Sequence, residues 1–296
     1  MKSILVPTDF SKNAYNAVKY AVAYAEKTKS KIILFHTYQN PTGKLVIPFT
    51  SVVHIGKQEA KEGAELKMKK LIATLSKIFP NIKPKWETQP GMASDNIIEY
   101  VKKNKIELII MGTTGQGAVM RALVGSTTSQ VINNTACTMI AVPPKAKFKE
   151  IHHMAMATNL ETIHSFAETE LVSFAKKHHT EITFVYIQDL ATYNSEELLK
   201  KIVDKTKKHL NYKKISMHVY SDSNVRDGLN QYIKKQKLDM LSMISHGTKF
   251  PETIWKTSWT NEMANHATIP LLILHHHNSN VTKKAPKKII NQSIGQ

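Results

Sequence analysis

The feature that most constrains this chain is an internal repeat, because one order of strand-like and helix-like segments occurs twice along its 296 residues. Three matches define the repeat: 5–8 with 154–158, 31–39 with 181–188, and 106–111 with 238–243. Self-similarity over long segments is the mark of a structural unit that has been duplicated. The chain is therefore expected to hold two copies of one unit.

Within each copy, short apolar runs alternate with amphipathic segments. In the first half the expected strands are 3–7, 31–38, 83–88, 107–111 and 138–142, and the expected helices are 11–27, 58–79, 94–103 and one that begins at 126. Such alternation predicts a parallel sheet with helices on both faces. Ser94 or Asp95 is placed to cap the third helix. The segment 40–57 has no counterpart in the second copy and is expected to be a surface loop.

The length suits two domains, and a hydrophobic fraction of 42% can fill two cores. We expect a first domain over 1–146, a second over 150–276 and a disordered basic tail over 277–296. The sequence contains no apolar run of eighteen residues and opens without a long apolar segment, which indicates a cytoplasmic protein. The single cysteine, Cys137, excludes an intramolecular disulfide and is expected to be a small buried side chain; no metal site is expected.

The formal net charge of +18 raises the question of a nucleic-acid ligand. The lysines are spread along helical faces, however, and arginine occurs only at Arg121 and Arg226. Arginine is the residue that most often reads base edges, so no specific nucleic-acid site is expected. Weak polyanion binding at low salt stays open as an alternative.

The stretch from Gly112 to Ser126 is the one that indicates a binding site. It follows an apolar strand, where open α/β sheets place their ligands, and its glycines let the backbone approach a ligand closely. Gly125 and Ser126 then begin another helix, whose free N–H groups and dipole favour an anion. The stretch is neither a P-loop nor a dinucleotide fingerprint.

The spacing G-x-x-G, nine residues, then G-[ST], met by Gly112, Gly115, Gly125 and Ser126, resembles the ATP-binding signature of the universal stress protein family. The segments 4–11 and 35–37 resemble the family's first strand and the end of its second. The resemblance extends over both halves and implies two tandem Rossmann-like domains of the adenine nucleotide alpha hydrolase-like kind. Each would hold a five-stranded parallel sheet in the order 3-2-1-4-5 with helices on both faces.

The resemblance also implies ATP as ligand, with Mg²⁺ or Mn²⁺ on its phosphates. Asp9 would contact the ribose or a metal-associated group, backbone groups at Thr37 the adenine edge, and the glycine loop the ribose and phosphates. The full set of expected nucleotide-binding residues is Pro7, Thr8, Asp9, His36, Thr37, Met111, Gly112, Thr114, Gly115, Gly117, Val124, Gly125, Ser126, Thr127 and Thr128. No catalytic residue is predicted.

The second copy departs from this pattern. Ile244 stands at the position of Gly112, and the other differences are Ala157 for Pro7, Asn159 for Asp9, Ile187 for Thr37 and Thr257 for Gly125. A branched side chain at the first glycine position occupies the space of the nucleotide. We therefore expect one ATP site, in the first domain, and a degenerate second domain that pairs with the first through the last strand of each as an intramolecular pseudo-dimer; a homodimer is also possible.

The sequence indicates the biological function less directly than it indicates the binding site. The reading that the sequence favours is a nucleotide-dependent stress-response or signalling module that is not an enzyme. A slow ATP hydrolase stays open as an alternative, although the loops hold no second group with an evident catalytic role beside Asp9. A small-ligand-binding protein without nucleotide turnover is the other alternative.

Overall fold

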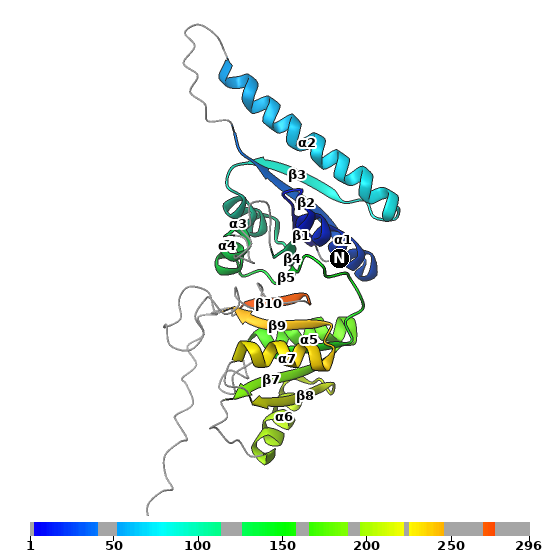
Figure 1. Cartoon of the computed structure of the whole chain (residues 1–296), viewed down its shortest axis with the longest axis vertical. Coiled ribbons are helices and arrows are strands. Elements are labelled where there is room, and N and C mark those ends of the chain that lie inside the picture. The colour runs from blue at the N-terminus through cyan, green and yellow to red at the C-terminus, as the bar shows by residue number, and fades with distance from the viewer. Residues whose placement is uncertain are drawn as a thin grey trace, which may run out of the picture.

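Strands and helices alternate through both halves of the computed structural model, which describes residues 3–40, 52–113, 126–157, 166–188, 196–221, 225–245 and 269–275 (Figure 1). The strands are β1 (Ser3–Pro7), β2 (Lys31–Tyr38), β3 (Lys85–Pro90), β4 (Leu108–Gly112), β5 (Met139–Val142), β6 (His153–Ala157), β7 (Glu181–Gln188), β8 (Ile215–Ser221), β9 (Met240–Ser245) and β10 (Leu271–His275). The helices are α1 (Lys12–Thr28), α2 (Val52–Ile78), α3 (Ala93–Asn104), α4 (Ser126–Asn134), α5 (Phe166–His178), α6 (Glu196–Leu210) and α7 (Val225–Gln236). The predicted α/β class is confirmed.

These strands form one sheet in the order β3-β2-β1-β4-β5-β10-β9-β6-β7-β8. Counted within each half, this is the order 3-2-1-4-5 that the family resemblance implies. Neighbouring strands run parallel within each half. β5 and β10 pair antiparallel, with Leu272 opposite Ile140 and Ile273 opposite Met139. This pairing joins the two five-stranded sheets and covers two edges that could otherwise pair with another chain.

The strands at the centre of the sheet are buried on both faces. Every residue of β4, β5 and β10 is buried. A parallel sheet that is covered by helices on both faces requires such near-continuous apolar sequences. The sequences LIIMG of β4 and MIAV of β5 meet that requirement, which is why their strand character could be read from the sequence.

Two hydrophobic clusters lie on the two faces of the sheet, and each runs through both halves. One contains Ile140 and Leu272 together with residues of α1, α2, α5 and α6. The other contains Met139 and Ile273 together with residues of α3, α4 and α7. Successive residues of a strand point to opposite faces, so the single β5–β10 pair contributes to both clusters. The halves are therefore joined by continuous apolar packing as well as by backbone hydrogen bonds.

The helix starts agree only in part with the sequence predictions. Ser11 caps α1, and its hydroxyl oxygen accepts a hydrogen bond of 3.1 Å from the backbone N–H of Ala14. The prediction that Ser94 or Asp95 caps α3 is wrong, because Met92 holds the N-cap position without a side-chain hydrogen bond. Ser94 instead lies buried in the first turn, where its hydroxyl donates to Asp95 Oδ1 at 3.3 Å.

Two further expectations are corrected. Helix α2 begins at Val52, so residues 52–57 of the segment expected to be a surface loop are helical. Cys137 is half-buried rather than buried, since it lies two residues before the start of β5 and lines a cavity between the two halves.

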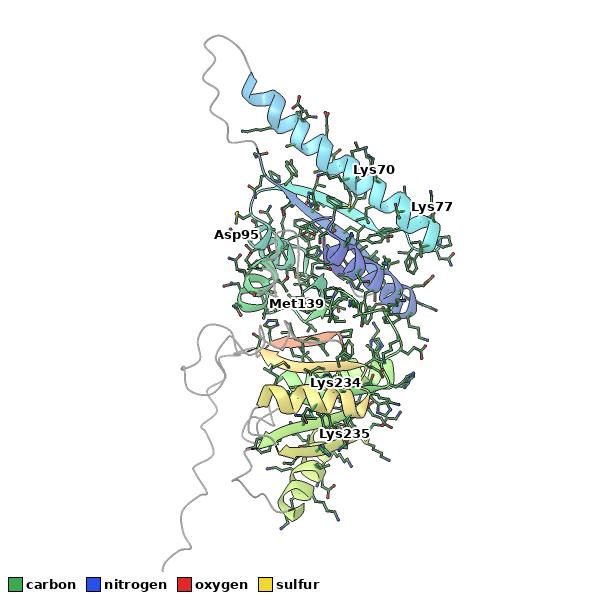
Figure 2. All side chains as sticks on the ribbon, viewed as in Figure 1. Lys70, Lys77, Asp95, Met139, Lys234 and Lys235 are labelled. Atoms are coloured by element: carbon green, nitrogen blue, oxygen red, sulfur yellow. The ribbon has the colours of Figure 1, made fainter. Side chains whose placement is uncertain are left out.

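The lysines of the described helices lie on their outer faces. Lys70 and Lys77 of α2 and Lys234 and Lys235 of α7 are exposed (Figure 2). This arrangement is that of solvated helix faces, as the sequence indicated. Among the described helices none combines the length and apolar character needed to cross a membrane.

Candidate nucleotide site

The loops after β1, β2 and β4 leave the same edge of the sheet, because these parallel strands are neighbours. Ile4 pairs with Leu108 of β4, and Pro7 pairs with Phe35 of β2. From β1 the chain builds outward through β2 and β3 and then returns to the other side of β1 with β4. Open α/β sheets bind their ligands in the crevice at such a reversal of strand order. The described part of the predicted site lies at this reversal.

The turn after β1 is fixed by short hydrogen bonds. The backbone N–H of Thr8 donates to the carbonyl of Phe35 at 2.8 Å, and the Thr8 hydroxyl accepts from the N–H of Phe10 at 3.1 Å. Asp9 Oδ1 accepts from the N–H of Ser11 at 2.9 Å. One carboxylate oxygen of Asp9 thus accepts a hydrogen bond within the turn. This bond holds the half-buried carboxylate in place at the end of β1.

Phe10 has a backbone conformation that its residue type rarely adopts. Its φ is 63°, in the left-handed region, and its ring centroid lies 4.4 Å from that of His36. A bulky residue held in this region costs on the order of 1–3 kcal/mol, and such strain concentrates at ligand sites. Packing against His36 and the hydrogen bonds of the turn hold Phe10 there.

His36 is oriented by the backbone of β1. Its Nδ1 lies 2.8 Å from the carbonyl oxygen of Thr8. A carbonyl can only accept, so Nδ1 carries the hydrogen and the neutral ring keeps Nε2 as an acceptor. Burial, together with the charge of Lys67, lowers the pKa of His36 despite the opposing effects of the Thr8 carbonyl and Asp9. The imidazole is therefore neutral at pH 7.

The remaining predicted residues of the strand ends have simpler surroundings. Pro7 and Met111 are buried within β1 and β4. Thr37 is half-buried in β2, opposite Gln89 of β3.

The start of α4 is tied to the end of β4. The Thr128 hydroxyl donates to the carbonyl oxygen of Gly112 at 3.0 Å, and both residues are buried. The next residue, Thr113, is also buried, and its N–H donates to the carbonyl of Val142 at 3.1 Å. Since the Thr128 proton is already donated, this residue positions α4 rather than offering its proton to a ligand.

Ser126 and Thr127 lie in the first turn of α4, one exposed and the other half-buried. This first turn contains no acidic residue. The free N–H groups and the positive end of the helix dipole are therefore not neutralised by the helix itself, which suits an anionic ligand.

Part of the predicted site lies outside the described residues. This part comprises Thr114, Gly115, Gly117, Val124 and Gly125 of the first half. In the second half, Asn159, Gly247, Thr257 and Ser258, the counterparts of Asp9, Gly115, Gly125 and Ser126, also lie outside the described residues.

The strand register shows which positions of the two halves are equivalent. Leu5 of β1 pairs with Ile109 of β4, and its counterpart Ala155 of β6 pairs with Leu241 of β9. Three residues further along each strand stand Gly112, the last residue of β4, and Ile244, one residue before the end of β9. Ile244 is half-buried and packs against the core. The second half thus places a branched apolar side chain where the first half has a glycine.

Two features of this edge escaped the sequence predictions. The strained backbone of Phe10 has no signal in residue propensity, because phenylalanine disfavours that conformation. The bond between His36 and Thr8 depends on the pairing of β1 with β2, which residue types alone do not specify. In the described segments, no group of three or more His, Cys, Asp or Glu side chains is placed to hold a metal ion.

Comparison with known proteins identifies the family. The model of the universal stress protein family matches residues 1–143 and 166–275, which together make up more than half of the chain. The chain is 29% identical over 154 residues to the universal stress protein MJ0531 of Methanocaldococcus jannaschii, a match that covers 49% of this chain and 84% of that protein. It is 27% identical over 155 residues to the universal stress protein MJ0577 of the same organism, a match that covers 49% of this chain and 96% of that protein.

A solved structure is similar over nearly the full length. The crystal structure of a universal stress protein from Archaeoglobus fulgidus superimposes with a TM-score of 0.70 at 15% identity, covering 92% of this chain and 98% of that one. At this identity the likeness concerns the fold. Both halves of the chain match the family model, so the chain belongs to the universal stress protein family as a tandem-domain member.

Proposed function

We propose that this protein binds one ATP, in its first half, at the edge where β1, β2 and β4 end. The observation that supports this most is the start of α4: a helix N-terminus without an acidic residue, tied by Thr128 to Gly112 at the reversal of strand order. Such a helix start suits phosphate groups. The positive net charge of the chain also favours approach of a polyanion.

In this proposal, Ser126, Thr127 and the glycine loop 112–125 bind the triphosphate. Asp9 and the turn after β1 face the ribose side, and Thr37 supplies backbone groups to the adenine. His36 and Phe10 hold the turn in shape through their ring contact. In this arrangement the phosphate-binding groups lie on the β4 side of β1, and the groups that contact the nucleoside lie on its β2 side.

A divalent cation would be held chiefly by the ATP itself. Mg²⁺ is commonly bound by phosphate oxygens, waters and one or two carboxylates. Asp9 is the carboxylate of the predicted site, and the described segments hold no cluster of three ligand side chains. One carboxylate fits a cation that binds together with ATP. It does not fit a cation site built from protein ligands alone.

The second half is proposed not to bind ATP in this manner. Ile244 stands in register where Gly112 stands in the first half, so its side chain would meet the phosphates or ribose. We divide the chain into domains at 1–146 and 150–276 and regard them as an intramolecular pseudo-dimer. The antiparallel β5–β10 pair and the two shared clusters support this assignment.

The protein then acts as a nucleotide-dependent stress-response module, in which ATP occupancy changes a surface or a packing contact rather than driving turnover. Helix α4 offers a route, because it begins at the phosphate loop and its Ile132 carbonyl lies 2.8 Å from Nε2 of the buried His275 at the end of β10. A change at the start of α4 would thus reach the second half directly.

The test is to purify the protein, denature it and identify the nucleotide that is released. ATP in an amount approaching one per chain, with negligible ADP formation over hours, is the expected result. Gly115→Val and Ser126→Ala should reduce retention at least tenfold. The matched variants Gly247→Val and Ser258→Ala, at the equivalent positions of the second half, should retain ATP as the wild type does. Retention that none of the four variants alters would place the nucleotide elsewhere, and rapid ADP formation would make the protein a hydrolase.

A further inference from the structure

Helix α6 and the turn after it form a strongly basic surface. Residues 200–214 contain seven lysines and one acidic residue, Asp204. Six of the seven lysines are exposed, and we call them the α6 basic surface: Lys200, Lys201, Lys205, Lys208, Lys213 and Lys214. One carboxylate cannot neutralise six ammonium groups, so this surface keeps a large positive charge.

The duplicated fold supplies a comparison for this charge. Helix α2 lies between β2 and β3 as α6 lies between β7 and β8. Residues 57–71 of α2, a stretch as long as 200–214, contain five lysines and three glutamates. Lys61 lies 3.9 Å from Glu65, one turn further along the helix. The lysines of α2 are thus interleaved with acidic residues of the same helix, which is the pattern of a solvated face.

In α6 the lysines follow one another instead. One turn before Lys205 stands Lys201, and one turn after it stands Lys208. Like charges at this spacing destabilise a helix. The helix dipole favours basic residues in the last turn, which here holds Lys207, Lys208 and His209, but this effect does not reach Lys201 or Lys205. The stability of α6 therefore does not account for its charge, and an anionic partner would.

A groove of about 320 Å³ between α5 and α6 extends the basic surface. It is lined by Thr169, Val172, Ser173 and Lys176 of α5 and by His209 and Leu210 of α6. The lining residues that can carry a charge, Lys176 and His209, are both basic. Hydroxyl groups of the threonine and the serine can donate hydrogen bonds to phosphate oxygens. The groove therefore suits an anionic group next to α6.

The position of α6 makes this surface a ridge. Figure 1 shows α6 at one end of the long axis of the molecule, next to β8, the last strand of the sheet, and α2 at the other end. Leu210 and Thr206 of α6 are buried. A helix that lies on a membrane turns its apolar side to the lipid, whereas this side of α6 packs within the protein. The side that a partner can reach is the lysine side.

The lysines reach both flanks of the ridge. Because successive residues of an α-helix are rotated by about 100°, Lys200, Lys208 and Lys205 span about 140° of the circumference. All three are exposed. They can therefore contact anionic groups on two sides of the helix at once.

The composition of the surface indicates phosphate groups rather than bases as its ligands. Residues 196–214 contain no arginine, the residue that most often reads base edges. The aromatic residue of this stretch, Tyr212, is half-buried, and its hydroxyl donates to the Thr180 carbonyl at 2.6 Å. Proteins that bind single strands stack unpaired bases on exposed aromatic rings. These residues thus suit the backbone of a double strand.

We propose that α6 lies in the major groove of double-stranded DNA and contacts the phosphates on both sides, independently of base sequence. An α-helix is about 10–12 Å across, and the major groove of B-form DNA is about 12 Å wide. Lys200, Lys205 and Lys208 would contact the phosphates that border the groove, and Lys213 would extend the contact beyond the end of α6. This surface is separate from the proposed nucleotide site, which lies in the first half.

The test is the fluorescence anisotropy of labelled DNA duplexes of two unrelated sequences, titrated with the full chain between about 50 and 200 mM salt. Both duplexes should bind with equal affinity, and log K should fall steeply and linearly with log salt. An RNA duplex of the same length should bind at least fivefold more weakly, because its major groove is too narrow to admit a helix.

Matched variants locate the surface. Lys200→Gln, Lys205→Gln and Lys208→Gln combined should weaken DNA binding at least tenfold at low salt and reduce the salt slope by about 2 to 3. Lys61→Gln, Lys69→Gln and Lys70→Gln combined, exposed lysines of α2, remove the same net charge and should leave the affinity within twofold of the wild type. The α6 variant should unfold at no lower urea concentration than the wild type, so that lost binding is distinguished from lost folding. Gly115→Val, which disrupts the proposed ATP site, should bind DNA as the wild type does.

Several results would overturn the proposal. These are absence of duplex binding at about 50 mM salt, an unchanged affinity of the α6 variant, or an equal loss in the α2 variant, which would reduce the effect to net charge. An RNA duplex that binds as tightly as DNA would exclude the groove, and tighter binding to phosphatidylserine vesicles than to DNA would make the partner a membrane.

Discussion

Asp239 anchors the connection between the halves, and its replacement gives a sharp stability prediction. Its Oδ2 accepts from the backbone N–H groups of His152 and His153, each at 2.9 Å, and its Oδ1 lies 2.6 Å from Lys149 Nζ. The Asp239 side chain is 11% exposed, whereas that of Lys149 is 61% exposed. The hydrogen bonds from the two backbone N–H groups to Asp239 are therefore expected to stabilise the fold more than the ion pair with Lys149.

The expected cost of Asp239→Ala follows from these contacts. Hydrogen bonds to a charged group contribute about 1.5–3 kcal/mol, and the two N–H groups share one oxygen. An exposed ion pair adds only about 0–1 kcal/mol. We expect Asp239→Ala to lower the free energy of unfolding by about 2–3 kcal/mol and Lys149→Met by less than about 1 kcal/mol.

The pH dependence of this effect gives a second readout. Burial raises the pKa of Asp239, but the hydrogen bonds from Lys149, His153 and His152 outweigh it, so the pKa is lowered overall. A carboxyl group whose folded pKa is lowered stabilises the fold above its unfolded pKa, about 3.9, and loses that contribution as pH falls through the folded pKa.

Urea unfolding of the wild type and both variants between pH 7 and pH 2.5 measures these effects. The difference between wild type and Asp239→Ala should be constant above about pH 5 and shrink below about pH 4. A difference that stays constant to pH 2.5, or a Lys149→Met variant as unstable as Asp239→Ala, would refute the reasoning.

Three further predictions concern packing, the phosphate edge and a helix cap. Leu272→Ala removes a fully buried side chain opposite Ile140 and should cost about 2–5 kcal/mol in urea unfolding, whereas Leu66→Ala, at a residue 53% exposed, should cost less than about 0.5 kcal/mol. Thr128→Val keeps the side-chain shape but loses the hydrogen bond to the end of β4; ATP affinity by titration should fall about three- to tenfold with the fold intact, and unchanged affinity would show that this bond does not position α4. Ser11→Ala removes the cap of α1 and should cost about 1 kcal/mol, with Ser11→Asp restoring most of it.

The order of elements could be predicted from the sequence because burial dictates residue type in this fold. The runs LIIMG and MIAV have few alternatives to a strand covered on both faces. The helix expected over 11–27 was placed correctly to within one residue, but the role of Ser11 as its cap was not predicted. Ser94 has an equally suitable hydroxyl but lies two residues past the N-cap position, which Met92 holds, and residue type alone does not distinguish the two cases.

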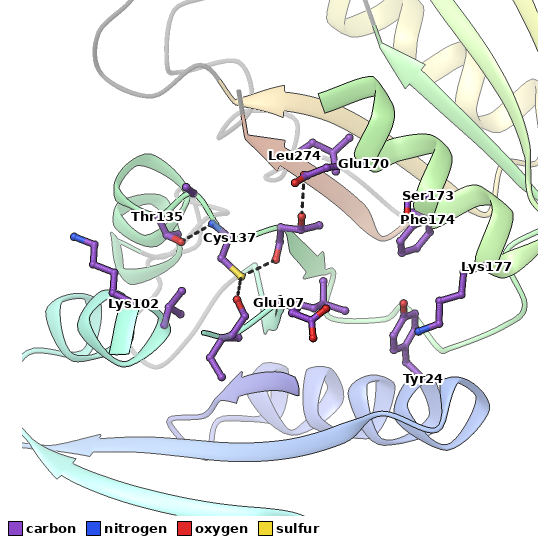
Figure 3. A pocket seen from close by; sticks show the side chains of 15 residues that line it. Tyr24, Lys102, Glu107, Thr135, Cys137, Glu170, Ser173, Phe174, Lys177 and Leu274 are labelled. Carbon is purple, nitrogen blue, oxygen red and sulfur yellow. Dashed lines mark hydrogen bonds between the residues drawn. The ribbon is translucent and has the colours of Figure 1, made fainter. Parts of the chain in front are cut away.

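That the described residues of the candidate site share one edge of the sheet could be expected from the sequence, but their contacts could not. Glycine spacing placed Gly112 at the end of a strand, yet the contact of Thr128 with its carbonyl depends on how α4 returns to β4. The strained Phe10 is held by His36 from a neighbouring strand. Residues of both halves, among them Glu107 and Glu170, line one pocket (Figure 3), and the sequence does not specify how the halves pack together.

The stoichiometry of ATP binding to nucleotide-free protein tests the central claim most directly. Isothermal titration with Mg²⁺ present should give one ATP per chain, with binding lost in Gly115→Val and kept in Gly247→Val. Two ATP molecules per chain, or one that Gly247→Val removes and Gly115→Val does not, would contradict the assignment of a single site to the first half.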